Sequence, residues 1–180
     1  GGIATYGAAA FFGCVVANNM CAPGYEPGIM ASGSAHFVNC TIANHCDLHP
    51  TINIGLGSDV LFENSIIAFN SIAFGDWLEA DLVMLTCCDV FGNEQGDWVY
   101  ELGDQLGVRG NVCVDPLFCG WMEHDFYLQE GSPCAAFTEP NPTCDLIGAL
   151  PIGCPGSSVV REMSWGLIKA LMRGEAAPSN

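Results

Sequence analysis

Two acidic stretches of the chain carry the residue types that hydrolytic chemistry would need. They read GDWLEAD and GDWVYELGDQ, and each opens with Gly-Asp-Trp. Inverting glycosidases hold an acid and a base carboxyl group about 6.5 to 9.5 Å apart. The candidate carboxylates are Asp76, Glu79, Asp81 and Asp97, followed by Glu101 and Asp104. The aromatic rings that could stack on a sugar belong to Trp77, Trp98 and Trp121.

Solvated acidic loops account for the same residues without any catalysis, and we expect the chain not to be an enzyme. We expect no cofactor; the alternative is calcium, which takes about six to eight oxygen ligands. His45 and His49 lie near Cys46 and Asp47, but no CxxC pair accompanies them, which argues against zinc. Arg109, in GVRGN, is the only base that a lyase could use there, and its setting is typical of a solvated turn.

The charge of the chain limits its partners. The 180 residues carry 20 acidic and 4 basic side chains, for a net charge of -16. Three of the four basic residues follow Cys154, so the preceding part is strongly acidic. Such a surface repels phosphate backbones and anionic lipids, so we expect neither nucleic acid nor a membrane surface as a partner. No apolar run reaches the length of about 20 residues that a membrane-spanning helix needs.

Eleven cysteines in so short a chain indicate an oxidising compartment, and hence an extracellular or cell-surface location. The odd number leaves at least one thiol free or paired with another chain, and the pairing cannot be read from the sequence. Buried thiols, which pack as small apolar residues, are the alternative. The disulfide candidates are Cys14, Cys21, Cys40, Cys46, Cys113, Cys119, Cys134 and Cys144.

The elements that must position these residues come from a repeated pattern. Four stretches share one pattern: FFGCVVANNMC, FVNCTIANHC, FENSIIAFN and LTCCDVFGN. In their alignment, equivalent positions (a column) are occupied by Phe11, Phe37, Phe62 and Leu85. The offsets are 26, 25 and 23 residues, a period at which repeats stack as supersecondary units. Leucine-rich repeats are excluded because LxxLxLxxN is absent, whereas β-branched residues, Gly and Asn favour short strands joined by tight turns. The pattern therefore predicts an all-β parallel β-helix, with Asn39 in a left-handed turn.

Two further columns follow from this alignment. Cys14, Cys40, Ser65 and Cys88 should line up along the stack, where Cys14 could bridge to Cys40, Cys21 to Cys46, or Cys40 to Cys46 within a turn. Asn18, Asn44, Asn70 and Asn93 should form a ladder of side-chain amides, unless they are four unrelated loop residues.

Residues 111–154 contain a series of linked motifs: an Asn, then DPLF, DFYL, GSPC and DLIGA. In this order they resemble the closing segment of bacterial right-handed parallel β-helix repeat proteins, the secreted and surface group related to polymorphic outer-membrane proteins. The resemblance implies a right-handed solenoid over residues 1–154 that ends in this segment. It leaves the activity open, because that group includes adhesins, polysaccharide-active enzymes and proteins of unassigned role.

Beyond residue 154 the chain changes character. Residues 155–163 read as a linker, and residues 164–180 as a short helix or tail, which is either a lid on its own solenoid or a connector to another subunit. The apolar residues at helical spacing there are Trp165, Ile168, Leu171 and Met172.

These patterns predict a secreted structural or surface protein. The chain opens in repeat register, so we expect a processed product whose first coil, with Gly1, Gly2 and Ile3, offers an unpaired edge to a second copy. End-to-end association into fibres or layers would follow, with homo-oligomeric copies as the main partner. The alternatives are a module that binds or cleaves polysaccharide, and a fragment of a larger adhesin.

Overall fold

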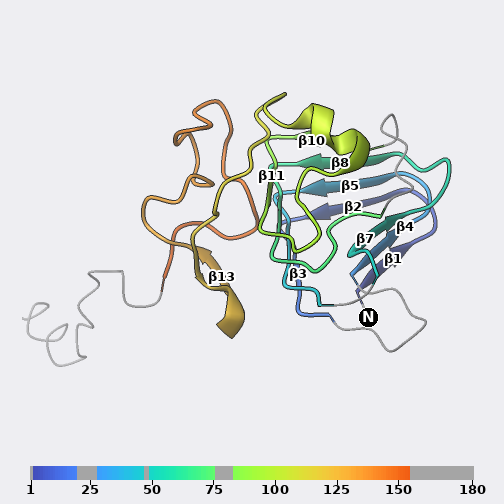
Figure 1. Ribbon diagram of the computed structural model, residues 1–180, viewed down its shortest axis with the longest axis horizontal. Coiled ribbons are helices and arrows are strands. Elements are labelled where there is room, and N and C mark those ends of the chain that lie inside the picture. The colour runs from blue at the N-terminus through green and yellow to red at the C-terminus, as the bar shows by residue number, and fades with distance from the viewer. Residues whose placement is uncertain (1, 20–27, 47–48, 76–82, 155–180) are drawn as a thin grey trace, which may run out of the picture.

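The protein is an all-β molecule built from stacked coils. The computed structural model describes residues 2–19, 28–46, 49–75 and 83–154 (Figure 1). The first three coils contribute strands to three sheets and the fourth coil to two of them, and every neighbouring pair in these sheets is parallel. The first sheet contains β1 (Ile3–Thr5), β4 (Ile29–Ala31) and β7 (Ile52–Ile54). The second contains β2 (Ala9–Phe12), β5 (Ala35–Val38), β8 (Val60–Glu63) and β10 (Val83–Thr86). The third contains β3 (Val15–Ala17), β6 (Thr41–Ala43), β9 (Ile66–Ala68) and β11 (Asp89–Phe91).

The strand registers confirm the predicted parallel β-helix. Phe11 pairs with Phe37, Phe37 with Phe62, and Phe62 with Leu85. The ring centroids of Phe11 and Phe37 lie 4.8 Å apart and those of Phe37 and Phe62 lie 5.0 Å apart, both as parallel stacks. This spacing is that of adjacent strands, so like side chains stack directly on like in the dry interior.

The corner between the second and third sheets depends on left-handed backbone. Gly13, Asn39, Asn64 and Cys87 occupy one column with φ of 60°, 49°, 46° and 51°. The predicted turn conformation at Asn39 is confirmed. Because Gly and Asn tolerate positive φ, each coil can turn there while the next residue remains in the interior.

The predicted asparagine ladder is divided between two neighbouring columns. The strand registers place Asn18 beside Asn44, whose Nδ2 donates to Asn18 Oδ1 at 2.6 Å. One residue further along, the column contains His45, Asn70 and Asn93. Asn70 Nδ2 donates to Asn93 Oδ1 at 2.9 Å, and the backbone N–H of His45 donates to Asn70 Oδ1 at 3.1 Å. His45 therefore takes the place of an asparagine in the second column.

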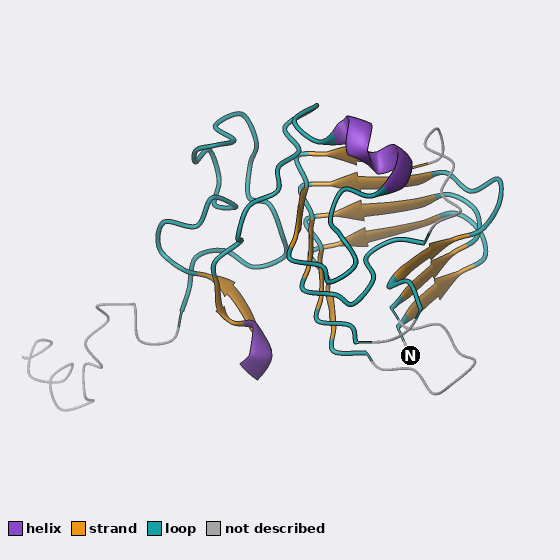
Figure 2. Ribbon diagram, viewed as in Figure 1, coloured by secondary structure: helices purple, strands orange, loops and turns teal. Residues whose placement is uncertain are grey.

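The end of the stack that follows β10 and β11 is covered by the 3₁₀ helix η2 (Tyr100–Gln105), as Figures 1 and 2 show. Leu102 is fully buried and belongs to the same apolar core as the stacked phenylalanines. The acidic loop predicted for this stretch is thus a 3₁₀ helix, which buries Leu102 and exposes Glu101 and Asp104.

The closing segment lies on the side of the stack and not across its end. It contains β12 (Phe118–Gly120), the 3₁₀ helix η3 (Trp121–Glu123) and β13 (Asp125–Leu128), with β12 antiparallel to β13. Its Phe118, Phe126 and Leu128 form a second core with residues of the third sheet, including Ile66 and Ala68. The predicted ending of the solenoid by this segment is thus corrected: η2 covers the end and the closing segment covers one face (Figure 2). The linker at 155–163 and the helix or tail at 164–180 lie outside the described residues.

Candidate interaction surfaces

The covered end is held by side chains that imitate a further strand. Gln105 accepts from the backbone N–H of Leu85 at 2.9 Å and donates through Nε2 to Val83 O at 2.8 Å. Arg109 donates through Nε to Leu85 O at 3.3 Å and through Nη2 to Gln105 Oε1 at 3.1 Å. The edge of β10 is therefore satisfied, and backbone pairing with another chain is blocked there.

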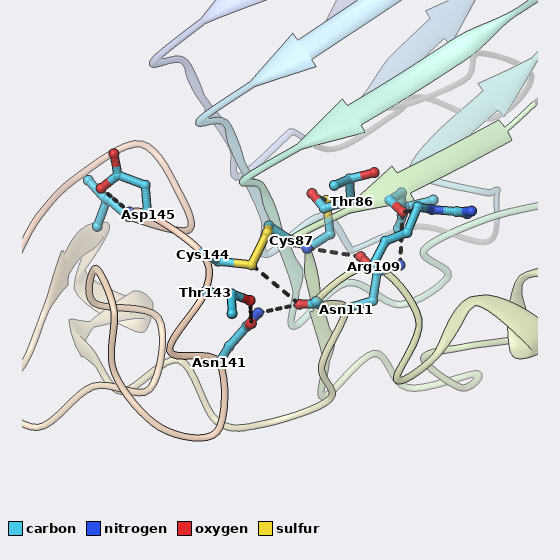
Figure 3. Close-up of a disulfide and its surroundings, with 12 residues drawn as sticks. Thr86, Cys87, Arg109, Asn111, Asn141, Thr143, Cys144 and Asp145 are labelled. Carbon is cyan, nitrogen blue, oxygen red and sulfur yellow. Dashed lines mark hydrogen bonds between the residues drawn. A yellow bond between two sulfur atoms is a disulfide. The ribbon is translucent and has the colours of Figure 1, made fainter.

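A disulfide ties this end to the closing segment. Cys87 and Cys144 are bonded with a Cα–Cα distance of 5.7 Å, and their surroundings are drawn in Figure 3. Asn141 Nδ2 donates to the carbonyl oxygen of Gly110, which lies beside the disulfide. Gly110 has φ of 77°, and a Cβ at this position would lie 2.5 Å from Cys144 Sγ. Only glycine fits between the coil and the disulfide.

At the first coil, no strand among the described residues pairs with the outward side of β1 or β2. The backbone N–H groups of Ala9 and Gly13 donate to Ser34 O at 2.9 Å and Val38 O at 3.0 Å in the next coil. Because successive N–H groups of a strand point in opposite directions, those of Ala10 and Phe12 face away from that coil. Ile3 lies on this edge in β1. Gly1 lies outside the described residues.

A shallow groove of about 590 Å³ lies over the outer face of the second sheet. Its floor is one outward column, Ala10, His36, Leu61 and Met84, and its rim includes Ser34 and Asp59. Met84 is 48 % exposed, and Phe12, which lies in the adjacent outward column beside His36, is 67 % exposed. This groove was not predicted, although one signal for it is in the sequence: β2 reads AAFF, with apolar residues at its outward positions.

Two of the glycan and acid candidates have structural partners. Asp97 Oδ1 accepts from Asn93 Nδ2 at 2.9 Å and from the Asn93 backbone N–H at 2.8 Å, so it completes the ladder of amides. Trp98 donates through Nε1 to Val112 O at 3.1 Å and packs against the core. Both residues are half-buried, and their roles in sugar binding or catalysis stay predictions.

Trp121 is half-buried and stacks on Phe69 with ring centroids 4.7 Å apart, so its indole also packs against the protein. Glu101 and Asp104 lie exposed on η2, and the other candidates lie outside the described residues: Asp76, Trp77, Glu79 and Asp81. The roles of all six stay predictions.

Asp89 is a buried carboxyl group that the sequence analysis missed. It projects outward from β11 beneath the closing segment and is fully buried. Its Oδ1 accepts from the Val114 backbone N–H at 3.0 Å, and Cys134 Sγ donates to its Oδ2 at 3.4 Å. Burial, opposed by those two hydrogen bonds, raises the pKa of Asp89 to about 7. The group therefore joins the closing segment to the stack.

The cysteines that line up along the stack are free thiols and form no disulfides with one another: Cys14, Cys40 and Cys88. Cys40 Sγ donates to Phe11 O at 3.5 Å and Cys88 Sγ to Phe62 O at 3.3 Å, each in the coil below. In-register parallel strands hold equivalent Cβ atoms near the strand spacing of about 4.8 Å, whereas a disulfide needs about 3.8 Å. The predicted Cys14–Cys40 bridge is therefore wrong. The predicted Cys40–Cys46 bridge is also absent, because both residues are free thiols.

Disulfides do form in the closing segment. Cys119, a predicted candidate, pairs with Cys154 at a Cα–Cα distance of 5.3 Å, and Cys144 pairs with Cys87. Cys113 and Cys134 are free thiols, and Cys21 lies outside the described residues. The two bonds indicate an oxidising environment for the protein.

Within the described parts of the chain, no group of three or more His, Cys, Asp or Glu side chains is arranged to hold a metal ion. His45 is buried with Nε2 3.0 Å from Val16 O, whereas His49 is exposed. Calcium at the residues that are not described remains a prediction. No helix in the described ranges is both long enough and apolar enough to cross a membrane.

Comparisons with protein-family models, curated proteins and solved structures gave no match.

Proposed function

We propose that the protein is a secreted structural protein of the bacterial surface, similar to the parallel β-helix repeat proteins whose closing motifs it resembles. In this proposal it associates with copies of itself through the edge of the first described coil. The observation that supports this most directly is the row of outward backbone groups along β2, including the N–H groups of Ala10 and Phe12, beside a stack whose other end is covered.

The covered end determines which contact the edge can make. Gln105 and Arg109 occupy the hydrogen-bonding positions next to β10. A second copy therefore cannot extend the sheet at that end, and strand pairing joins first coil to first coil. Such a contact uses the same surface on both copies and gives a two-fold dimer. Fibres or layers then require one further contact elsewhere on the molecule.

A proline placed on the edge tests the proposal. Phe12→Pro removes an N–H that faces away from the second coil, so it costs the monomer no internal hydrogen bond. We expect the variant to remain folded by circular dichroism and to lose the edge-to-edge dimer in sedimentation velocity. Phe12→Ala, which keeps the N–H, is the matched control and should still dimerise.

Two results would contradict the proposal. One is a Phe12→Pro variant that associates as tightly as the Phe12→Ala control. The other is an intact mass of the native secreted protein that shows further coils upstream, because those coils would occupy the edge.

A further inference from the structure

The outer face of the second sheet carries several apolar side chains. The groove floor holds Ala10, Leu61 and Met84 together with His36, and Phe12 lies beside His36 in the adjacent outward column. Contiguous apolar surface of this kind marks a binding site more often than an inert surface. A groove of about 590 Å³ is also within the size range of sites that enclose a few side chains.

The charges around the groove select a cationic partner. Asp59 is exposed on its rim, and Glu63 lies on the adjacent outward column, where its Oε2 is 3.2 Å from His36 Nε2. In the described ranges Arg109 is the one Lys or Arg side chain, and it is engaged at the covered end. An apolar groove with an acidic rim fits an apolar segment that carries Lys or Arg.

This chain contains one such segment. Residues 161–173 read REMSWGLIKALMR and hold three of the four basic residues of the chain, Arg161, Lys169 and Arg173. Between them, Trp165, Ile168, Leu171 and Met172 recur at helical spacing. An apolar helix face lying in a groove is a common mode of peptide recognition.

We propose that residues 161–173 of one copy dock in the groove of a second copy, with Lys169 near Asp59. The contact is heterologous, because segment and groove are different surfaces, and it supplies the second contact that a fibre or layer needs. This inference rests on the proposed self-association. Cys154, from which the segment departs, is bonded to Cys119 in the closing segment on the third sheet, whereas the groove lies on the second sheet. The intervening residues 155–160 span at most about 22 Å.

A charge exchange in the full-length protein tests the pairing. Asp59→Lys and Lys169→Glu should each weaken self-association about tenfold in the dissociation constant, measured by sedimentation equilibrium. The double variant restores opposite charges and should recover most of the lost affinity. A double variant no tighter than either single variant would overturn the pairing of these two residues.

The groove itself is tested by Met84→Lys, with Val108→Lys as the control. Both residues are similarly exposed, 48 % and 44 %, but Val108 follows η2 at the covered end. Only Met84→Lys should weaken association. Equal behaviour of the two variants, or wild-type protein whose residues 161–173 crosslink only within one copy, would refute docking on a second copy.

The two contacts can fail independently. Phe12→Pro and its control Phe12→Ala both lose the ring beside the groove, so the difference between these two variants reports only the edge N–H, and Asp59→Lys should leave the edge-to-edge dimer intact. If Phe12→Pro has no effect while the charge exchange behaves as expected, the docking holds and the edge pairing is wrong. The reverse result refutes the docking alone.

Discussion

At the corner after the second sheet, one interior residue in each coil donates a hydrogen bond to a backbone carbonyl of the coil below. Cys88 donates to Phe62 O at 3.3 Å, and Ser65 to Phe37 O at 3.4 Å. In the next coil Asn111 fills the position and donates to Leu85 O at 2.9 Å. Three residue types perform one task there, because each combines small volume with a donor.

Asp89 is the residue whose protonation should alter stability. Its carboxyl group is fully buried, with pKa raised to about 7 from an ordinary value of 3.8. The charged groups that add to this shift are Asp97 and Asp115, while the Cys134 thiol opposes it. Folding therefore favours the neutral form of Asp89. The stabilisation is complete below the unfolded pKa and is lost as the pH rises toward the folded pKa.

We predict that Asp89→Asn stabilises the protein above pH 7 and abolishes much of this pH dependence. The free energy of unfolding of the wild type should fall between about pH 4 and pH 7 by up to about 4 kcal/mol more than that of the variant. Denaturant titrations across this range measure the difference. Asp89→Leu, which removes the acceptor for the Val114 N–H, is the control and should not reproduce the gain.

At the scale of elements, the repeated strands could be predicted from the sequence, but the helix η2 that covers the end of the stack could not. The repeated phenylalanines predict the strand register, since stacked coils place like residues on like: Phe11 pairs with Phe37, and Phe37 with Phe62. The helix η2 occurs once, so no internal alignment identifies it, and its exposed acidic residues resemble a loop. The ladder prediction failed in part because His45 supplies the contacts expected of an asparagine.

We predict that Gln105→Ala opens the covered end. The change leaves the Leu85 N–H and the Val83 carbonyl without their partner in a buried setting, at a cost of about 2 kcal/mol. Hydrogen exchange should show faster exchange at the Leu85 amide. Glu101→Ala, an exposed change in the same helix, should leave that amide protected, and equal protection in both variants would refute the role of Gln105.

At the scale of the whole molecule, two apolar cores meet across the third sheet. Residues on both faces of β6 and β9 are buried, in contrast to the alternating burial of β5 and β8. This absence of alternation, TIA and IIA in the sequence, is typical of strands covered on both sides and could have revealed the lateral cover. The family-like motifs identify the closing segment but carry no information about the face on which it docks.

We predict that Cys87→Ser with Cys144→Ser loosens the closing segment while the coils stay folded. The bond links residues 57 apart, so its loss should cost about 4 kcal/mol. Amide exchange should quicken around Phe118 and Phe126, which belong to the second core. Uniform quickening that includes Phe37 and Phe62 would show instead that the molecule unfolds as one unit.

The donor role of the interior thiols has a consequence for biosynthesis. Cys40 and Cys88 must stay reduced to donate their hydrogen bonds to backbone carbonyls. Cys87, next to Cys88 in the chain, is oxidised in its disulfide with Cys144. Burial raises the pKa of Cys88 to about 12 and so withholds its thiolate from exchange once the coils have closed around it. An oxidant that acts after the coils have closed would therefore reach Cys87 and leave Cys88 reduced.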